Sequence, residues 1–555
     1  MKKSKFLDIN YFIIFIVSLL LIFPLINNLY FEGHDTGYHI ANILAISDNL
    51  SYHNLFNLKI FPLIANNFGY GSGIFYPQLS HFMAALIYNV FPNILVFTSL
   101  KITNFIIIFL SGILMYRFMK VSTKNKKLAF LATIFYLTIP YKIYDYLVRD
   151  AVAESLVFVF LPLIFLSFYY IFNKQYKKFY INFIIGYVGL INSHLVMTIY
   201  VTLFLIVILI TQFKKFWNRE IIKRCFRATG VVLLICLPFI IPLITHLVRG
   251  SYVVFDKGQM ANRFGVYSGG LNIYHYFIGW PKEIGYHFLN IVGFLLVIYL
   301  IVKLKKANMI KRKLQQDYLF ATGLICTSLG IWMSSLLFPW FLMPNFLLMI
   351  QFPWRLGTFT GIGISILVYY AFLEIKDMYW NKAYILSIIF CILVAIFCIM
   401  AQDYKKLSID DYNLSQLGMG WQKEYLPVKL KKKQKYLKKR GNDILVMKGN
   451  ALITNVINDT PYLKFRVDEV SDAVLELPRI YYLGYKITVD YGDKKENISY
   501  KENENGFIEI SLKKSAIIEV DYEGTPLARI SNKISVITMM GFLIFIVFKR
   551  GEENG

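Results

Sequence analysis

Long apolar segments recur along most of this 555-residue chain and are separated by short polar loops. About 20 apolar residues are what a helix needs to cross the hydrocarbon core of a bilayer. The apolar positions are continuous rather than alternating, so they predict helices and not a membrane barrel. We expect a polytopic α-helical membrane protein with about twelve spans, over residues 11–30, 94–117, 128–141, 152–172, 179–194, 195–212, 228–248, 287–303, 317–338, 356–374, 383–401 and 533–548.

The pattern changes in residues 402–532, where apolar and polar positions alternate in short stretches separated by Gly, Asn and Asp. A period of two is typical of half-buried strands. It predicts a β-sandwich-like domain between a transmembrane module, 1–401, and a final span with its tail, 533–555. The clearest candidate strands are 462–467, 485–489, 507–512 and 516–522.

Lys and Arg gather in alternate loops, which predicts the orientation of the chain. Cytoplasmic loops of membrane proteins are enriched in these residues. With the N-terminus inside, the basic loops all fall on the cytoplasmic side, the C-terminus is also inside and residues 402–532 are extracytoplasmic. The formal net charge of +25 is thus explained by topology, and nucleic-acid binding is excluded as its cause. The basic loops are 117–127, 174–178, 214–227 and 303–313.

One apolar piece, Pro77–Phe91, does not fit this alternation. If it were a span, every later basic loop would lie outside. It is also short, and Pro92 follows it. We therefore interpret it as a re-entrant or interfacial helix within a large first outer loop, 31–93.

Composition agrees with a membrane protein, at 57% hydrophobic residues and a mean hydropathy of +0.51. Average globular chains are closer to half apolar. The cysteines lie in or beside apolar segments and none has metal-ligand spacing, so neither a zinc motif nor a disulfide scaffold is indicated. They are Cys225, Cys236, Cys326, Cys391 and Cys398.

The segment that follows the first predicted span carries Glu32, His34, Asp35 and His39. Asp35 and His39 are four residues apart and would share one face of a helix. A carboxylate beside an imidazole suits general-base chemistry on a hydroxyl. The same residues also fit a plain helix start, in which Asp35 or Thr36 is the N-cap. The two interpretations are compatible.

Two further outer segments carry charges at membrane depth, where ionisable groups are costly and usually have a partner or a function. The first holds Arg149, Asp150 and Glu154. Its arginine suits a phosphate, or forms a local ion pair. The second is Gln351-Phe-Pro-Trp-Arg355, in which Arg355 suits a lipid phosphate or reaches the interface as a snorkelling side chain.

Weaker candidates complete the set. His194 lies at the outer turn between two spans, where it is either a ligand or a packed histidine. Tyr70 and Tyr76 belong to a Gly/aromatic loop that either closes over a sugar or is a tight turn. The basic run Lys429–Arg440 either binds anionic headgroups or an anionic polymer, or is a solvated linker.

The order and spacing of these motifs resemble a known family. A first span, a large outer loop with acidic residues at its start and many later spans are similar to the GT-C glycosyltransferases, which include protein O-mannosyltransferases and the aminoarabinose transferase of lipid A. The motifs also resemble bacterial membrane proteins of the YfhO-like group and those labelled 6-pyruvoyl-tetrahydropterin synthase-related. The matching motifs are Gly33-His-Asp35 with His39, Tyr70–Pro77, Arg149–Glu154, Gln351–Arg355 and Leu477–Tyr485.

The resemblance implies a glycosyltransferase of the bacterial plasma membrane that takes a sugar from a polyprenyl-phosphate donor and passes it to a cell-envelope acceptor on the outer face. It implies that Asp35 acts as base, with His34, His39 and Glu32 near it, and that Arg355 and Arg149 bind the donor phosphate. Many members carry two adjacent acidic residues, whereas here Gly33 and His34 separate them, which leaves open whether a divalent metal takes part; no cofactor is certain. The remaining substrate-binding candidates are Glu154, Asp150, His194, Tyr70 and Tyr76.

Two alternatives remain open at this point. One is a non-catalytic carrier or assembly scaffold for envelope polysaccharide, which would need the outer domain but not Asp35. The other is a membrane acyltransferase that uses a histidine. A transporter is less favoured, because its charges would lie near the bilayer midplane.

Overall fold

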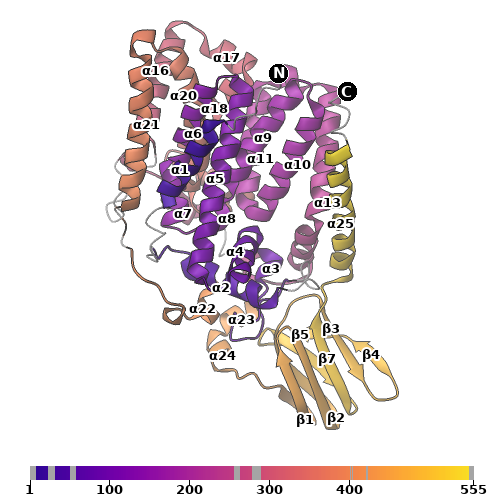
Figure 1. The fold of residues 1–555 in the computed structure, drawn as a ribbon. Coiled ribbons are helices and arrows are strands. Elements are labelled where there is room, and N and C mark those ends of the chain that lie inside the picture. Colours follow the sequence, from indigo (N-terminus) through magenta and orange to yellow (C-terminus); the bar gives the residue numbers. More distant parts are fainter. Residues whose placement is uncertain are drawn as a thin grey trace, which may run out of the picture. The chain divides into compact units, whose positions relative to one another are not determined.

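The computed structural model describes residues 8–22, 30, 32–50, 58–255, 263–277, 289–400, 402, 404–420 and 423–548 (Figure 1). The chain forms two compact units. The first unit comprises Met1–Thr36, Phe97–Val232 and Ala261–Leu407, and the second comprises Gly37–Val96, Leu233–Met260 and Ser408–Gly555.

All twelve predicted apolar segments contain a helix. Within the described residues, six helices are long and apolar enough to cross a membrane. The others are shorter or less apolar, so the number of spans stays a prediction. The six are α5 (Val96–Thr123), α8 and α9 (Val152–Ser155 and Val157–Phe172), α13 (Arg219–Arg249), η5 and α20 (Pro353–Leu356 and Gly357–Leu373), α21 (Asp377–Met400) and α25 (Pro526–Phe548).

The remaining helices of the first unit fall into two groups. Six coincide with predicted apolar segments: α1 (Ile9–Ile22), α6 (Lys126–Leu137), α10 (Tyr176–Ser193), α11 (Leu195–Thr211), α16 (Ile291–Lys306) and α18 (Tyr318–Ser334). The connecting helices are α7 (Pro140–Leu147), α12 (Phe213–Phe216), α15 (Arg263–Ser268), η3 (Ile273–Tyr276), α17 (Ile310–Gln316), η4 (Trp340–Leu342) and α19 (Asn345–Leu348).

Polar side chains define where several of these helices begin. The side chain of Asn125 accepts a hydrogen bond from the Leu128 backbone and caps α6. Asp317 caps α18 through the backbone amides of Leu319 and Phe320, at 3.0 and 3.1 Å. Such caps satisfy backbone donors that have no partner within the helix.

Small residues allow α18 and α20 to pack closely. A Cβ added to Gly330 would collide with Thr360 of α20, and one added to Gly363 would collide with Thr327 of α18. Close contact through small residues is how apolar helices associate where the hydrophobic effect offers little between them.

Helices α1 and α5 run antiparallel. Asp8, directly before α1, accepts hydrogen bonds from Tyr116 and Lys120 in the last turns of α5, each at 2.8 Å. A single crossing by residues 77–91, or any odd number of crossings between these helices, would instead make them parallel. The geometry thus agrees with the prediction that residues 77–91 do not cross.

Other basic loops of the first unit are joined at the same end. Lys126 Nζ lies 3.8 Å from Asp8, and the neighbouring carbonyl of Lys127 accepts a hydrogen bond from Tyr384. The side chain of Gln212 donates to the carbonyl of Leu314 at 2.6 Å, which joins two further loops.

The second unit contains the predicted first outer loop from Gly37 onward and the C-terminal region from Ser408 onward. Its helix α4 spans only Leu79–Val90, about 18 Å at 1.5 Å per residue, which is short of a hydrocarbon core of about 30 Å. The other helices are α2 (Thr36–Asn49), which begins at the boundary between the units, α3 (Ser72–Phe75), η2 (Val253–Phe255), η6 (Ile409–Asp411), α22 (Leu414–Leu417), α23 (Val428–Lys432), α24 (Gln434–Lys439), the last part of α13, and α25.

The predicted strands are present, but they form one curled antiparallel sheet rather than a small sandwich (Figure 1). Strand β2 is 19 residues long and pairs with β7 along its first half and with β6 along its second half. Strands β6 and β7 follow each other along the chain and together form one interrupted strand beside β2. The strands are β1 (Leu445–Asp459), β2 (Tyr462–Ile480), β3 (Tyr485–Asp490), β4 (Lys495–Ile498), β5 (Lys501–Glu502), β6 (Phe507–Leu512) and β7 (Ala516–Tyr522).

Candidate functional site

Two of the motifs singled out in the sequence lie against each other in the first unit. The backbone amide of His34 donates to the carbonyl of Val148 at 3.0 Å, and that of Asp35 donates to the carbonyl of Arg149 at 2.9 Å. The segment 32–36 is therefore attached to the loop between α7 and α8 by its backbone, independently of its side chains.

Glycine at position 33 makes this attachment possible. A Cβ there would lie 2.7 Å from the Cβ of Asp150 and 2.8 Å from the carbonyl oxygen of Val148. Real Cβ atoms do not approach other atoms so closely. The close contact explains why a glycine stands between Glu32 and His34.

Asp150, the next residue of the same loop after Arg149, also holds this segment. Its carboxylate accepts a hydrogen bond from Thr36 Oγ1 at 2.7 Å, and this hydroxyl in turn accepts one from the Gly33 amide at 2.9 Å. Asn104 of α5 approaches the second carboxylate oxygen at 3.5 Å. Asp150 also has a φ of +53°, a strained conformation for a residue with a side chain.

Burial, together with the negative charge of the nearby Asp35, raises the pKa of Asp150 to about 7. The hydrogen bonds from Thr36 and Asn104 lower this pKa, but they do not offset the loss of water. Asp150 also lines a small cavity of about 30 Å³, together with Tyr30, Lys101 and Asn104. That is room for about one water molecule.

Beside this segment, two arginines share one carboxylate. Arg149 Nη1 lies 2.7 Å from Glu154 Oε2, and Arg355 Nε lies 3.2 Å from the same oxygen. Arg149 Nη1 also lies 2.5 Å from Asp145. All four residues are buried. Two positive and two negative charges cancel, which is the condition for burying ions at a tolerable cost.

Neutral partners hold the two acidic groups in place. Tyr141 donates its hydroxyl to Glu154 at 2.6 Å, and Ser155 donates to Asp145 at 3.0 Å. Arg355 also donates to the carbonyl of Ile350 at 3.0 Å. Buried networks of this kind are stable only when most of their polar atoms are satisfied.

Aromatic rings lie along the arginines. The guanidinium of Arg149 lies over the ring of Trp354, 4.8 Å from its centroid. Tyr144 packs edge-on against the same ring at 5.7 Å. Trp354 and Tyr144 are only half-buried. Half-buried aromatic faces beside charged donors are what sugar and lipid ligands commonly contact.

The remaining predicted residues of the first unit occupy distinct positions. Asp35 is half-buried, and no described residue donates a hydrogen bond to its carboxylate. His34 is exposed. Glu32 is also exposed and forms an ion pair with Lys405. His194 is the N-cap of α11, where its Nδ1 accepts a hydrogen bond from Met197.

His39 belongs to the second unit and is 1% exposed. Its Nδ1 lies 2.7 Å from Nε2 of His81 on α4, and Nδ1 of His81 lies 2.8 Å from the amide oxygen of Gln78. Burial and the neighbouring His39 lower the pKa of His81 well below its usual value. The lowered pKa favours the neutral form of His81, which shares one hydrogen bond with His39.

The two tyrosines of the Gly/aromatic loop also lie in the second unit. Tyr70 is completely buried, and its hydroxyl donates to the carbonyl of Met419 and accepts from the amide of Tyr425. These contacts make Tyr70 a packing residue within its unit. Tyr76 is half-buried and its ring lies 5.7 Å from that of His81.

Among the described residues, no group of three or more His, Cys, Asp or Glu side chains is arranged to hold a metal ion. Several contacts were not anticipated from the sequence. Asp145 carried a signal, because it stands four residues before Arg149, a spacing that favours ion pairs on a helix. His81 carried none, since it lies 42 residues from His39.

No protein-family model matches the chain. It is similar to an uncharacterized protein of Lactococcus lactis subsp. cremoris (strain MG1363), with 25% identity over 346 residues. These residues cover 60% of this chain and 54% of that protein, so the match spans about half the length of the relative.

Proposed function

We propose that the protein is a membrane glycosyltransferase that moves a sugar from a polyprenyl-phosphate donor to a cell-envelope acceptor on the outer face of the membrane. One observation carries the proposal: the Glu32–Thr36 segment, the Arg149–Glu154 segment and Arg355 lie together in the first unit. They supply an accessible carboxylate, two guanidinium groups and half-buried aromatic rings within one region.

Asp35 is the proposed general base. No described residue donates a hydrogen bond to its carboxylate, so an acceptor hydroxyl can do so. Asp35 would take the proton of that hydroxyl as its oxygen forms a bond to the anomeric carbon. The bond from that carbon to the phosphate oxygen breaks, and the electron pair leaves with the polyprenyl phosphate. The exposed His34 would orient the acceptor.

Arg149 and Arg355 are the proposed phosphate ligands. A guanidinium has five N–H donors. All hydrogen bonds that Arg149 forms with described side chains come from Nη1, and those of Arg355 also come from its Nη1. Nε of Arg355 is buried beside Glu154. The Nη2 groups of both arginines form none of these hydrogen bonds and are the proposed donors to oxygens of a phosphate, whose charge grows as the sugar leaves.

The test compares envelope glycans from a deletion strain that carries the wild type, Asp35→Asn or Arg355→Ala at equal expression. We expect both variants to lose transfer by at least about 100-fold, the lower range for a general base or a charge-stabilising group. Glu32→Gln is the matched control, because Glu32 is exposed and forms an ion pair with the exposed Lys405. Wild-type glycans in both Asp35→Asn and Arg355→Ala would exclude this mechanism.

A specific observation favours one alternative, a non-catalytic carrier or assembly scaffold for envelope polysaccharide. The four buried charges already neutralise one another, and the cavity beside Asp150 has room for about one water molecule. A scaffold predicts that Asp35→Asn keeps normal polysaccharide while Arg355→Ala loses the folded protein. The same strains therefore distinguish the two functions.

A further inference from the structure

The basic run 428–440 of the second unit is folded and is not a solvated linker. Its two short helices, α23 and α24, bury Leu430 and Leu437 to 0% and 1% exposure. Leu430 packs beside Gly506, which precedes β6. Because the apolar side chains point to the sheet, the lysines between them face outward: Lys429, Lys432, Lys433, Lys435, Lys438 and Lys439 are exposed.

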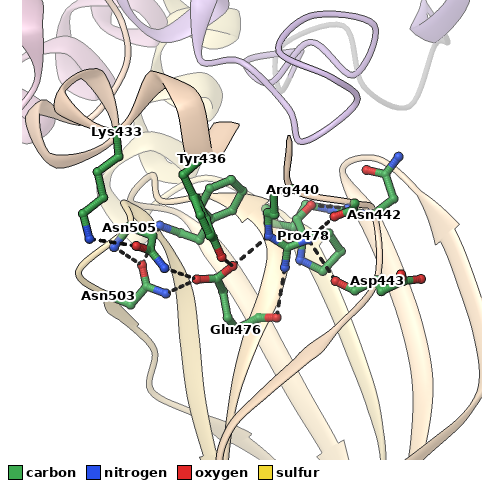
Figure 2. A network of polar contacts seen from close by, with 12 residues as sticks. Lys433, Tyr436, Arg440, Asn442, Asp443, Glu476, Pro478, Asn503 and Asn505 are labelled. Atoms are coloured by element: carbon green, nitrogen blue, oxygen red, sulfur yellow. Dashed lines mark hydrogen bonds and ion pairs between the residues drawn. The ribbon is translucent and has the colours of Figure 1, made fainter. Parts of the chain in front are cut away.

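A buried carboxylate fixes the end of this segment to β2. Figure 2 shows Tyr436, Arg440, Asn503 and Asn505 around Glu476, which is completely buried. Tyr436 and Arg440 donate to one carboxylate oxygen at 2.7 Å each, and the two asparagines donate to the other at 2.5 and 2.9 Å. Burial alone would raise the pKa of Glu476, but these four donors hold it below its usual value.

These lysines lie close together, so their positive charges repel one another. Among the described residues, Lys432, Lys435, Lys438 and Lys439 form no ion pair, whereas Lys429 pairs with Glu502 at 3.3 Å. Burial lowers the pKa of Lys423, and the charges of Lys438 and Lys431 lower it further. Fixed repulsion of this kind does not stabilise a fold, so it points to an anionic ligand.

The same segment is tied to the end of a candidate membrane span. The amide of Val428 donates to the carbonyl of Ser251 at 3.0 Å, two residues beyond the end of α13 at Arg249. The amide of Val254 likewise donates to the carbonyl of Glu424. Lysines next to the end of a membrane helix lie at the depth of the lipid headgroups.

A second candidate span ends near the same sheet. Strand β7 ends at Tyr522 and α25 begins at Pro526, so only three residues separate them. Ser535 of α25 donates to the carbonyl of Ile235 in α13, which joins the two spans. The amide of Leu483, before β3, donates to His246 of α13 at 3.1 Å. The sheet is thus bound to both helices close to their ends.

We propose that the exposed lysines of α23 and α24 bind the phosphate headgroups of anionic lipids in the membrane that α13 and α25 cross. The short connections to both spans favour lipid over a soluble polyanion, because they keep the lysines at the bilayer surface. This inference does not depend on the proposed glycosyltransferase activity.

The test uses the full-length protein in nanodiscs of phosphatidylcholine, with or without phosphatidylglycerol. Lysines are modified with an amine-reactive ester and quantified by mass spectrometry. We expect phosphatidylglycerol to slow modification of Lys432, Lys435, Lys438 and Lys439 by about fivefold, the effect of about 1 kcal/mol per lysine. High salt should remove the protection.

Matched variants distinguish lipid binding by this lysine surface from an effect of the total charge of the protein. Replacing these four lysines by Gln should abolish the shift in unfolding temperature that phosphatidylglycerol causes. The control replaces four exposed lysines elsewhere on the sheet and should keep that shift: Lys448, Lys494, Lys513 and Lys514. Equal modification in both kinds of nanodisc would overturn the proposal. So would protection by soluble polyphosphate in phosphatidylcholine discs without protection by phosphatidylglycerol.

Discussion

Asp150 is the residue in which strain, burial and position coincide. It has a positive φ, it lines the small cavity, and it holds the segment that contains Asp35 through the Thr36 hydroxyl. Asp150 therefore helps to hold the segment that contains the proposed base. Because its pKa is raised, the folded protein binds this proton more tightly than the unfolded chain does.

Because of this raised pKa, Asp150 should make the stability of the protein depend on pH. Protonated Asp150 contributes about 4 kcal/mol to the free energy of unfolding. This contribution is fully present below pH 3.8, falls as the pH rises and is lost above about pH 7. Asp150→Asn should remove that part of the pH dependence of the unfolding temperature in detergent. Asp493→Asn, at an exposed turn, should not change it. Parallel pH profiles for Asp150→Asn and the wild type would contradict the assignment.

At the level of residues, sequence reasoning found charged groups but not all their partners. Arg149, Glu154 and Arg355 were predicted site residues, and they do meet in the first unit. Their mutual neutralisation could not be predicted, because Glu154 and Arg355 are some 200 positions apart along the chain and meet only where α8 and η5 lie together in the fold. His81 was missed for the same reason.

At the level of elements, the pattern of apolar positions predicted helices and strands well. The bounds of β6 and β7 agree with prediction to the residue. The sandwich did not follow from the same pattern, because alternation shows which face of a strand is buried but not whether its neighbours form one sheet or two. The continuity of β6 and β7 beside β2 decided for one curled sheet.

The attachment of residues 32–36 is an element-level feature that a single methyl group should disrupt. Gly33→Ala places a Cβ against Asp150 and Val148, which should lower the free energy of unfolding by about 1–3 kcal/mol, the usual cost of overpacking. It should also reduce transfer, because Asp35 moves with the loop.

Gly230→Ala is the matched control. A Cβ there meets no atom within 4 Å, and Ala in a helix is favoured over Gly by about 1 kcal/mol. Equal unfolding temperatures for the two alanine variants, measured by scanning fluorimetry, would show that the close contact at Gly33 is not rigid.

At the level of the whole molecule, the distribution of charge predicts the orientation. Basic loops are joined at one end of the first unit, and the antiparallel arrangement of α1 and α5 agrees with a first outer loop that does not cross. The orientation stays a prediction, and it rests on the Lys and Arg of the loops because these residues report on topology. The sequence could not tell how many of the shorter helices cross, since length alone does not decide it.

Accessibility of single cysteines tests the orientation. Cys225 is replaced by Ser first, since the other four cysteines are buried. In intact cells, a membrane-impermeant maleimide should label Glu32→Cys and Lys494→Cys but not Lys305→Cys. All three should react after permeabilisation. Labelling of Lys305→Cys in intact cells would reverse the proposed sides.

The place where the chain leaves the sheet has a mechanical consequence. Strand β7 lies between β2 and β3 and is antiparallel to both. Hydrogen bonds of an antiparallel ladder are perpendicular to the strands. A pull transmitted from α25 through Glu523–Thr525 therefore loads β7 in shear along both neighbours at once, so that its bonds resist together instead of opening one after another. The sheet is thus attached to the candidate span α25 through a strand that hydrogen-bonds to a neighbour on each side.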